Sequence, residues 1–270
     1  GTSFYANSLG VIASAGAGSI TDTSITGVSI KCPTLAAKNC GVIAAATGGF
    51  VSCKNLTISD VNCTDSKVTS DNTFGAIGSV SGGSLDTVSI SKVNINDSTI
   101  TSDYVGAVAN LEYGSGTVSG LSVSNINVTD STINSTVTGI GIGGIENQTI
   151  YNTSVSDIKI SKVTNKSSSS AGIIGAIDND GYLNNTVIRN ISILDSSITA
   201  QYTGAIGNVA SSGAGVYNTL ISGVTIGTDP ADDEDEVNAK LDATYAGIAV
   251  GFNKGVISGI TVGTHEAGVT

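Results

Sequence analysis

Apolar residues recur along the chain in a fixed pattern, read in segments such as SITGVSI, SISKVNI and VIRNISI about every 32 residues. A spacing of two residues between successive apolar positions is typical of a β-strand, and the spacing of three residues that precedes it indicates a bend. No apolar period of 3.6 residues is present, and β-branched residues fill the pattern, so helices are not expected. The three apolar columns are Ile25, Ile58, Ile90, Val123, Val155, Ile188, Ile221 and Ile257; then Val28, Val61, Val93, Ile126, Ile158, Ile191, Val224 and Ile260; then Ile30, Cys63, Ile95, Val128, Ile160, Ile193, Ile226 and Val262.

The residue just before the middle column indicates a corner of the backbone. It is Gly27, Asp60, Lys92, Asn125, Asp157, Asn190, Gly223 or Gly259 in successive repeats. Gly, Asn and Asp are the residues that tolerate a positive φ, whereas lysine suits such a corner poorly. The sequence therefore predicts a turn of the chain at this column.

A second motif of small residues precedes each strand of this kind, as in CGVIA, FGAIG and TGAIG. Its glycines are Gly10, Gly41, Gly75, Gly106, Gly139, Gly172, Gly204 and Gly247. A third short element with one inward apolar residue follows in most repeats, as in SKVTS, STITS, STINS and SSITA. Three short strands per ~32 residues predict a parallel β-solenoid of about eight coils, stacked at ~4.8 Å. We expect one all-β domain over residues 1–270, with an acidic loop inserted at about 229–240.

These motifs resemble the GLUG-type and related repeat solenoids of secreted and cell-surface proteins. The resemblance rests on the G-[AIV]-[IV]-G stretch, the Gly-rich turn that follows and the [VI]-x-x-[VI]-x-[VI] strand, and it covers nearly the whole chain. It implies an extracellular, adhesin-like or fibre-forming role and no enzymatic activity.

Composition narrows the function classes. Hydrophobic residues make up 40% of the chain and recur in register, which argues against disorder. The net charge is -11, so no basic stripe is available for nucleic acid. The sequence contains no run of ~18 apolar residues, so no membrane-spanning helix is predicted. Residue 1 is glycine, which leads us to expect a processed N-terminus.

The four cysteines, Cys32, Cys40, Cys53 and Cys63, lie in the first quarter of the chain. An even number in a chain of this texture predicts two disulfides in the first coils. Cys53 and Cys63 share one predicted strand and are too far apart to bridge each other, but the other pairings stay open. A zinc site is the alternative, although the spacings fit no CxxC pattern.

Two surface features suggest modification or ion binding. The acidic loop offers Asp229, Asp232, Asp233 and Asp235 as weak calcium ligands, and a solvated loop is the alternative. No other cofactor is expected. Asn-x-Ser/Thr sequons predict a glycosylated surface, with Asn96 and Asn165 pointing outward at turns. The sequon asparagines are Asn55, Asn62, Asn96, Asn127, Asn134, Asn147, Asn152, Asn165, Asn184 and Asn190.

The two ends of the predicted solenoid look complementary. A solenoid needs caps, because its terminal coils expose unpaired strand edges, and we find no capping helix. The chain opens where the third strand of a preceding coil would lie, and it ends after a second strand. We expect head-to-tail polymerisation by strand addition, with Phe4 and Tyr5 as apolar anchors; frayed ends are the alternative. The residues expected at the joint are Thr2, Ser3, Phe4, Tyr5, Ala6, Asn7, Ile260, Val262 and Val269.

The expected function is therefore an extracellular filament subunit whose partner is itself. A monomeric adhesin or stalk that binds glycans is the alternative. Ice binding is a less expected hypothesis, suggested by the aligned outward residues Thr69, Thr99, Thr101, Thr132 and Thr199. Lys67, Asn134 and residues 167–170 interrupt this array. A polysaccharide-degrading β-helix is also less expected, because Arg189 and His265 are the only arginine and the only histidine. The small-residue face around Gly75, Ala76 and Gly78 fits either a lateral contact or a packed interior.

Overall fold

The computed structural model describes residues 3–12, 14–15, 18–47, 52–112, 117–228 and 239–263. These residues form β-strands only, in two ten-stranded parallel sheets, so they contain no helix that could cross a membrane. Sheet A contains β1 (Ser3–Leu9), β3 (Thr34–Thr47), β5 (Lys67–Ser81), β7 (Thr99–Val105), β8 (Val108–Glu112), β11 (Thr132–Glu146), β13 (Thr164–Asp178), β15 (Ser197–Val209), β17 (Lys240–Ala246) and β18 (Val250–Asn253). Sheet B contains β2 (Ser19–Ile30), β4 (Ser52–Thr64), β6 (Ser84–Asn96), β9 (Val118–Ser119), β10 (Ser122–Thr129), β12 (Thr149–Ser161), β14 (Tyr182–Leu194), β16 (Gly215–Gly227), β19 (Val256–Ser258) and β20 (Thr261–Gly263).

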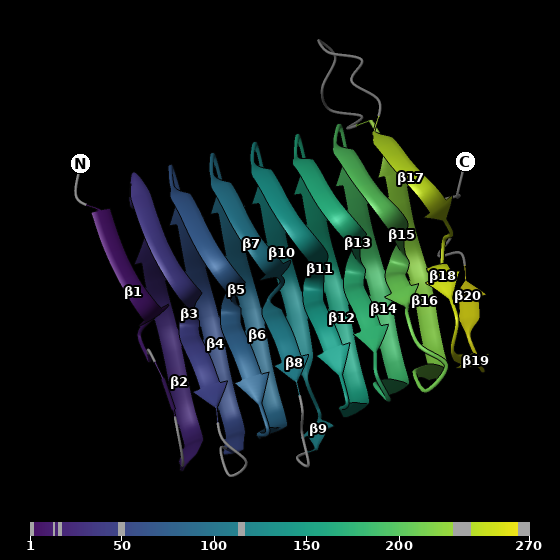
Figure 1. Ribbon diagram of the computed structural model, residues 1–270, viewed down its shortest axis with the longest axis horizontal. Helices are drawn as coiled ribbons and strands as arrows, with labels where there is room; N and C mark the ends of the chain where they lie inside the picture. Colours follow the sequence, from purple (N-terminus) through teal and green to yellow (C-terminus); the bar gives the residue numbers. More distant parts are fainter. Residues whose placement is uncertain are drawn as a thin grey trace.

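The chain passes alternately from one sheet to the other, and each strand pairs with the equivalent strand about 33 residues away. Figure 1 shows the resulting stack of coils along the long axis of the molecule. The predicted parallel β-solenoid is confirmed. About six complete turns lie between two shorter terminal ones, and the main path of each sheet contains eight strands.

Most complete coils contain two long strands, so the prediction of three short ones is wrong; in one coil these strands are divided into β7, β8, β9 and β10. The third short element and the glycine motif form one continuous strand, as in β5, where Lys67–Ser81 includes both KVTS and FGAIG. The two elements merge because the backbone bends by register shifts, such as the one between Thr69 and Thr73, while its pairing to the neighbouring coil continues.

The three apolar columns are confirmed from the first coil to the seventh. Ile25, Ile58 and Ile90 are direct neighbours in sheet B, and the series continues through Val123, Val155, Ile188 and Ile221. The columns enclose the core between the two sheets, where most of these side chains are fully buried. Each residue stacks on a near-identical one, so the same side-chain shape packs repeatedly along the axis.

The column assignment of the last coil is wrong. Ile257 pairs with Val216, and Val262 takes the place beside Ile221 that the sequence predicted for Ile257. The length of the preceding segment explains the shift. Val250 and Ile142 occupy the same column of sheet A. In a complete coil Ile150, at the start of the next sheet B strand, follows Ile142 by eight residues, and Ile257 follows Val250 by a similar seven residues. Ile257 therefore lies at the start of the sheet B strand, beside Val216.

The predicted corner residues all have a positive φ, from 53° at Lys92 and Asn125 to 71° at Gly27. A second corner that the sequence analysis missed lies five residues earlier on the same strands. It holds Asp22, Asn55, Thr87, Gly120, Asn152, Asn185 and Asn218. Gly259 belongs to this second corner, because a Cβ built on it would lie 2.8 Å from the Asn218 Oδ1 atom. Lys92 tolerates its corner with its ammonium group 3.5 Å from the Asp60 carboxylate of the preceding coil.

We predict that Asn125→Val destabilises the protein by about 1–2 kcal/mol, because a β-branched residue is strained at positive φ. The Asn125 side chain is exposed, so its removal costs little packing. Asn125→Gly is the matched control and should unfold like the parent in urea. Equal unfolding midpoints for the valine and glycine variants would contradict the strained corner.

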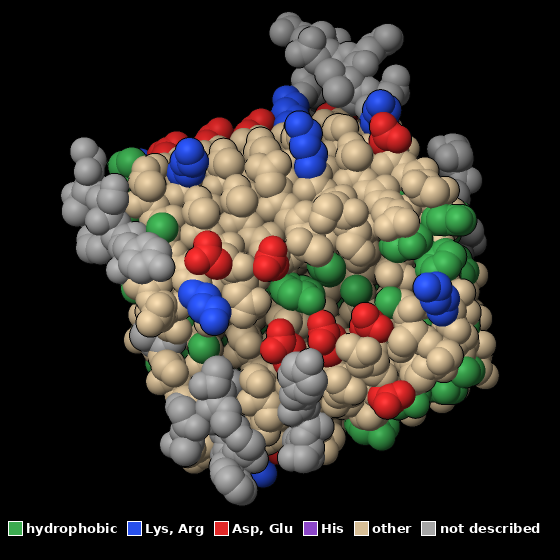
Figure 2. Space-filling model, in the orientation of Figure 1, with side chains coloured by type: hydrophobic (Ala, Val, Ile, Leu, Met, Phe, Trp, Pro, Cys, Tyr) green, Lys and Arg blue, Asp and Glu red, His purple; other side chains and the backbone are tan. Residues whose placement is uncertain are grey.

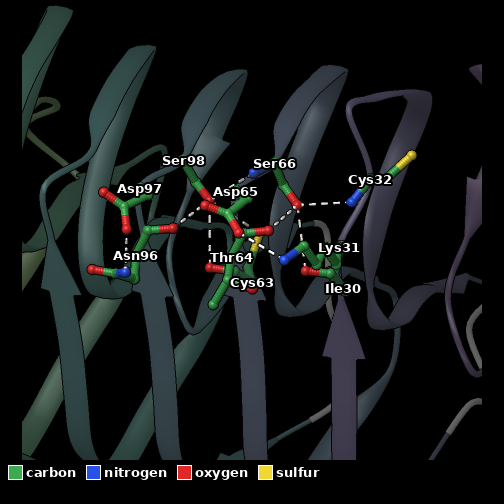
Figure 3. Close-up of polar contacts among 10 residues, drawn as sticks. All are labelled: Ile30, Lys31, Cys32, Cys63, Thr64, Asp65, Ser66, Asn96, Asp97 and Ser98. Atoms are coloured by element: carbon green, nitrogen blue, oxygen red, sulfur yellow. Dashed lines mark hydrogen bonds and ion pairs between the residues drawn. The ribbon is translucent and has the colours of Figure 1, made fainter. Parts of the chain in front are cut away.

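Buried serines link neighbouring coils by hydrogen bonds where the chain passes from sheet B to sheet A. Each serine hydroxyl donates to the carbonyl two residues before it, at 2.8 Å for Ser66 and Ser98 and 2.6 Å for Ser131. It also accepts a backbone N–H from the preceding coil, as from Ser66 N to Ser98 Oγ at 3.2 Å (Figure 3). Ser98 N donates to Ser131 Oγ in the same way, at 3.1 Å. Val163 N and Ser196 Oγ repeat this contact at 3.0 Å. The ladder satisfies polar groups that would otherwise be costly to bury.

The small-residue face is packed interior. Ala76 is 4% exposed and Gly78 is buried. The motif glycines stack on one another, with Gly41 paired to Gly75 and Gly172 paired to Gly204. A Cβ on Gly75 would lie 2.1 Å from the carbonyl oxygen of Gly106, so only glycine allows the coils to approach this closely.

Candidate functional site

The predicted disulfides are wrong, since no bond joins any two of Cys32, Cys40, Cys53 and Cys63, all of which lie in the described residues. Cys53 stacks between Ile20 and Leu85, and Cys63 between Ile30 and Ile95. These thiols occupy apolar columns and serve as core side chains. Burial, with a contribution from Cys63, raises the pKa of Cys40 to about 12, so its thiol stays protonated and unreactive at neutral pH.

The sequon asparagines differ in access. Asn55, Asn152 and Asn190 are exposed, and Asn62, Asn96, Asn127, Asn134, Asn147 and Asn184 are half-buried. Asn165 does not point outward as predicted. It is 5% exposed because it occupies the inward column between Ile133 and Ile198, where its Oδ1 accepts the Ser167 hydroxyl at 3.0 Å. A glycan at Asn165 would require the coil to open.

Several residues that the sequence analysis singled out lie outside the described residues. They are Thr2, Val269, His265 and the acidic residues Asp229, Asp232, Asp233 and Asp235. Within the described ranges, no group of three or more His, Cys, Asp or Glu side chains is arranged to hold a metal ion. The calcium reading of the acidic loop therefore stays a prediction.

The threonine array has the register that ice binding would need, but other side chains interrupt it. Thr99, Thr132 and Thr164 are neighbours in sheet A, and Lys67 and Lys240 occupy the same column. In the adjacent column Asn134 and Lys166 separate Thr101 from Thr199. The lysines break the flat hydroxyl surface, which does not favour ice binding.

The C-terminal end of the solenoid is apolar and open. Among the described residues ten large apolar side chains are exposed, and eight of them lie between 220 and 262. These eight are Leu220, Ile226, Leu241, Tyr245, Ile248, Val256, Ile257 and Val262. Most continue columns that are fully buried in the middle coils, so the end exposes a cross-section of the core. Such a surface is typical of an interaction site.

A cavity of about 340 Å³ lies between the sheets at this end. Its lining includes Ile173, Ile191, Ile226, Leu241 and Ile248, of which the last three are exposed at the end face. The cavity follows from the shift of the last coil: β19 and β20 pair with the first part of β16, and no described strand covers Val224–Gly227. The last coil therefore leaves the core unfilled.

The N-terminal end presents the same columns. Ile20, Ile25, Val28 and Ile30 of β2 pack against the core but are only partly buried, because β2 is the edge strand of sheet B among the described residues. Val11 is 60% exposed. Of the residues predicted for the joint, Ser3, Phe4, Tyr5, Ala6 and Asn7 lie in β1, the edge strand of sheet A, Val262 lies in β20, and Ile260 lies just before it. The described N-terminal residues of this set therefore lie at one end of the solenoid, and the described C-terminal residues lie at the other.

A row of carboxylates, here called the acidic ladder, was missed by the sequence analysis. It consists of Glu112, Glu146 and Asp178, which follow one another in sheet A at the ends of β8, β11 and β13. Figure 2 shows acidic side chains in a row on one face of the molecule, beside a hollow. A signal existed in the segments NLE, GIE and AID, where an acidic residue ends each glycine-motif strand.

The Glu112 end of the ladder is partly buried. The Tyr104 hydroxyl donates to Glu146 Oε1 at 3.0 Å, and the Asn110 amide nitrogen donates to Glu112 Oε1. Burial and the Glu146 charge raise the pKa of Glu112. Burial and the Glu146 carboxylate also raise the pKa of Tyr104, so the phenol remains a donor.

The ladder carboxylates extend from neighbouring strands of one sheet in a single column. They can act together on one cation or on one polar group.

Comparisons with known proteins add little. No protein-family model matches the chain, and no curated protein matches it. One solved structure that was found is a trypsin-treated form of QnrB1, a plasmid-mediated fluoroquinolone resistance protein, with 10% identity over 91% of this chain and 92% of that chain. Its TM-score of 0.17 is too low to carry an argument. The resemblance to GLUG-type repeats, the extracellular location and the absence of enzymatic activity stay predictions.

Proposed function

We propose that the protein is the repeating subunit of an extracellular filament, assembled by stacking the C-terminal end of one solenoid on the N-terminal end of the next. The observation that carries the proposal is the open apolar C-terminal end, with its uncovered core columns and its cavity. An apolar surface of this kind is stabilised by removal from water, and a second copy of the chain offers a matching surface.

The match is one of register. Leu241 ends the sheet A column that begins at Phe4, so β1 of a second copy would place Phe4 beside Leu241. In sheet B, Ile257 ends the column that begins at Ile20, and Val262 ends the one that begins at Ile25. Continuing the same parallel pairing across the joint therefore sets apolar residues against apolar residues in both sheets.

Val28 and Ile30 of the second copy complete the argument. Val28 is the first residue of the column whose last residue is Val224, and Ile30 is the first residue of the column whose last residue is Ile226. Val224 and Ile226 line the cavity. Stacking would bring both side chains over the cavity mouth. The contact joins two different surfaces, so it propagates as an open fibre and does not close into a dimer.

The experiment is to concentrate the 270-residue chain and to follow it by sedimentation and negative-stain microscopy. We expect unbranched fibres whose mass grows with protein concentration. The path of eight strands in each sheet gives an axial repeat of roughly 38 Å at ~4.8 Å per strand. Monomers at every concentration, or fibres with a repeat unrelated to ~38 Å, would contradict the proposal.

A further inference from the structure

Two carboxylates of the acidic ladder stand one coil apart. Glu112 and Glu146 directly follow Leu111 and Ile145, which are paired residues of β8 and β11. Paired positions on neighbouring strands are about 4.8 Å apart, so the two negative side chains extend side by side from one face. Both are half-buried, which weakens the screening of their repulsion by water.

An unsatisfied oxygen lies beside this pair. Asn110 is fully buried, and its Oδ1 atom makes no hydrogen bond in the described structure. A Cβ on Gly144 would lie 2.6 Å from this oxygen and 2.8 Å from the Tyr104 ring, so the absence of a side chain at Gly144 leaves room for both groups. The Tyr104 hydroxyl reaches Glu146 from the same place. Leaving a buried amide oxygen without a partner is costly, so a ligand within reach of this oxygen would be favoured there.

The chain supplies no positive charge to this cluster among the described ion pairs. Those pairs join Lys31 to Asp65, Lys54 to Asp86, Lys92 to Asp60 and Lys240 to Asp242, all away from the ladder. A cation bound between Glu112 and Glu146 would offset the repulsion between these two half-buried, neighbouring carboxylates.

We propose that Asn110, Glu112 and Glu146 bind a divalent cation of the calcium type. The oxygen set of two carboxylates and one amide is hard, as calcium prefers, and water would complete the shell. Calcium–oxygen bonds of about 2.3–2.6 Å let one ion bridge carboxylates ~4.8 Å apart, whereas magnesium requires shorter bonds in a stricter octahedron. Three protein ligands imply weak binding, with a dissociation constant on the order of 10⁻⁴–10⁻³ M, as in extracellular calcium modules.

Terbium luminescence tests the site, because Tb³⁺ replaces Ca²⁺ and is sensitised by a nearby tyrosine, and the chain contains no tryptophan. With the complete chain we expect Tyr-sensitised emission that Ca²⁺ displaces in the millimolar range and that equal Mg²⁺ does not. The double variant Glu112→Gln/Glu146→Gln should bind Tb³⁺ at least 10-fold more weakly, since loss of even outer partners of a metal costs roughly 10–100-fold. The double variant Tyr104→Leu/Tyr113→Leu should bind Ca²⁺ in calorimetry but lose the sensitised emission, because Tyr113 directly follows Glu112 in the chain and would also sensitise the ion.

Asp97→Asn/Asp130→Asn is the matched control, because it removes the same charge from two exposed carboxylates outside the proposed site, at positive-φ positions that asparagine tolerates. It should keep the emission and the affinity of the parent. The glutamine variant should remain folded, since removing two repelling charges does not destabilise the calcium-free protein. Unchanged Tb³⁺ affinity in the glutamine variant, loss of binding in the control variant, or equal displacement by Mg²⁺ would overturn the proposal. The test does not depend on polymerisation.

Discussion

Gly75→Ala is expected to lower the stability of the protein by about 3 kcal/mol, at the upper end of the usual cost of overpacking. The added Cβ would lie 2.1 Å from the carbonyl oxygen of Gly106 and 2.9 Å from that of Ile77. Both contacts are with backbone, which cannot rotate away as a side chain can. The coils also cannot move apart locally, because the ladder hydrogen bonds hold them at ~4.8 Å. Urea unfolding followed by circular dichroism measures the loss.

Gly227→Ala is the matched control. This glycine lies at the end of β16, has no heavy atom within 4 Å of a built Cβ, and does not have a left-handed φ. Alanine there should leave stability unchanged or raise it slightly, since it restricts the unfolded chain. If both alanine variants unfold at the same urea concentration, close packing of the glycine column is not the reason that position 75 requires glycine.

Val262→Lys and Ile25→Lys are each expected to abolish fibre formation, because each buries a charge at the proposed joint. Val262 lies on the C-terminal end and Ile25 on the N-terminal end of the same column. Each variant retains one intact end. A mixture of the two should therefore form a dimer, in which the Ile25→Lys copy offers its C-terminal end and the Val262→Lys copy offers its N-terminal end. Sedimentation velocity of each variant and of the mixture measures this outcome.

Tyr151→Lys is the control for a lysine at an exposed apolar position, since Tyr151 is 40% exposed on sheet B in the middle of the stack. It should polymerise like the parent. Thermal unfolding checks that the end variants fold. The stacking model fails if either end variant forms fibres, or if the mixture contains only monomers.

The sequence predicted the architecture because a solenoid repeats its local rules. Each coil places the same residue type in the same environment, so the columns of Ile58, Val61 and Cys63 are visible without a structure. Corner residues were also predictable, since a positive φ selects Gly, Asn and Asp. Even Lys92, which breaks this preference, adopts the conformation that the other members of its column impose.

Strand number was not predictable from the same rules. The third element and the glycine motif look separate because the apolar period is interrupted at the bend, yet hydrogen bonding to the next coil continues through the bend in β5. The cysteines were misread for a related reason. Cys53 and Cys63 have the spacing of two inward positions on one strand, and inward positions are filled by stacking on Ile20 and Ile30. Composition alone does not distinguish a buried thiol from half of a disulfide.

The sequence by itself thus determined the repeat, its inward columns and one of its corners, because these depend on residues close together in each coil. Only the tertiary structure decided which coil a residue meets. It placed Ile257 beside Val216, buried Asn165 between Ile133 and Ile198, and aligned Glu112 with Glu146. Each of these outcomes depends on the number of residues that connect one sheet to the other. That number sets which residues pair between neighbouring coils, and the pairing exists only in the stacked structure.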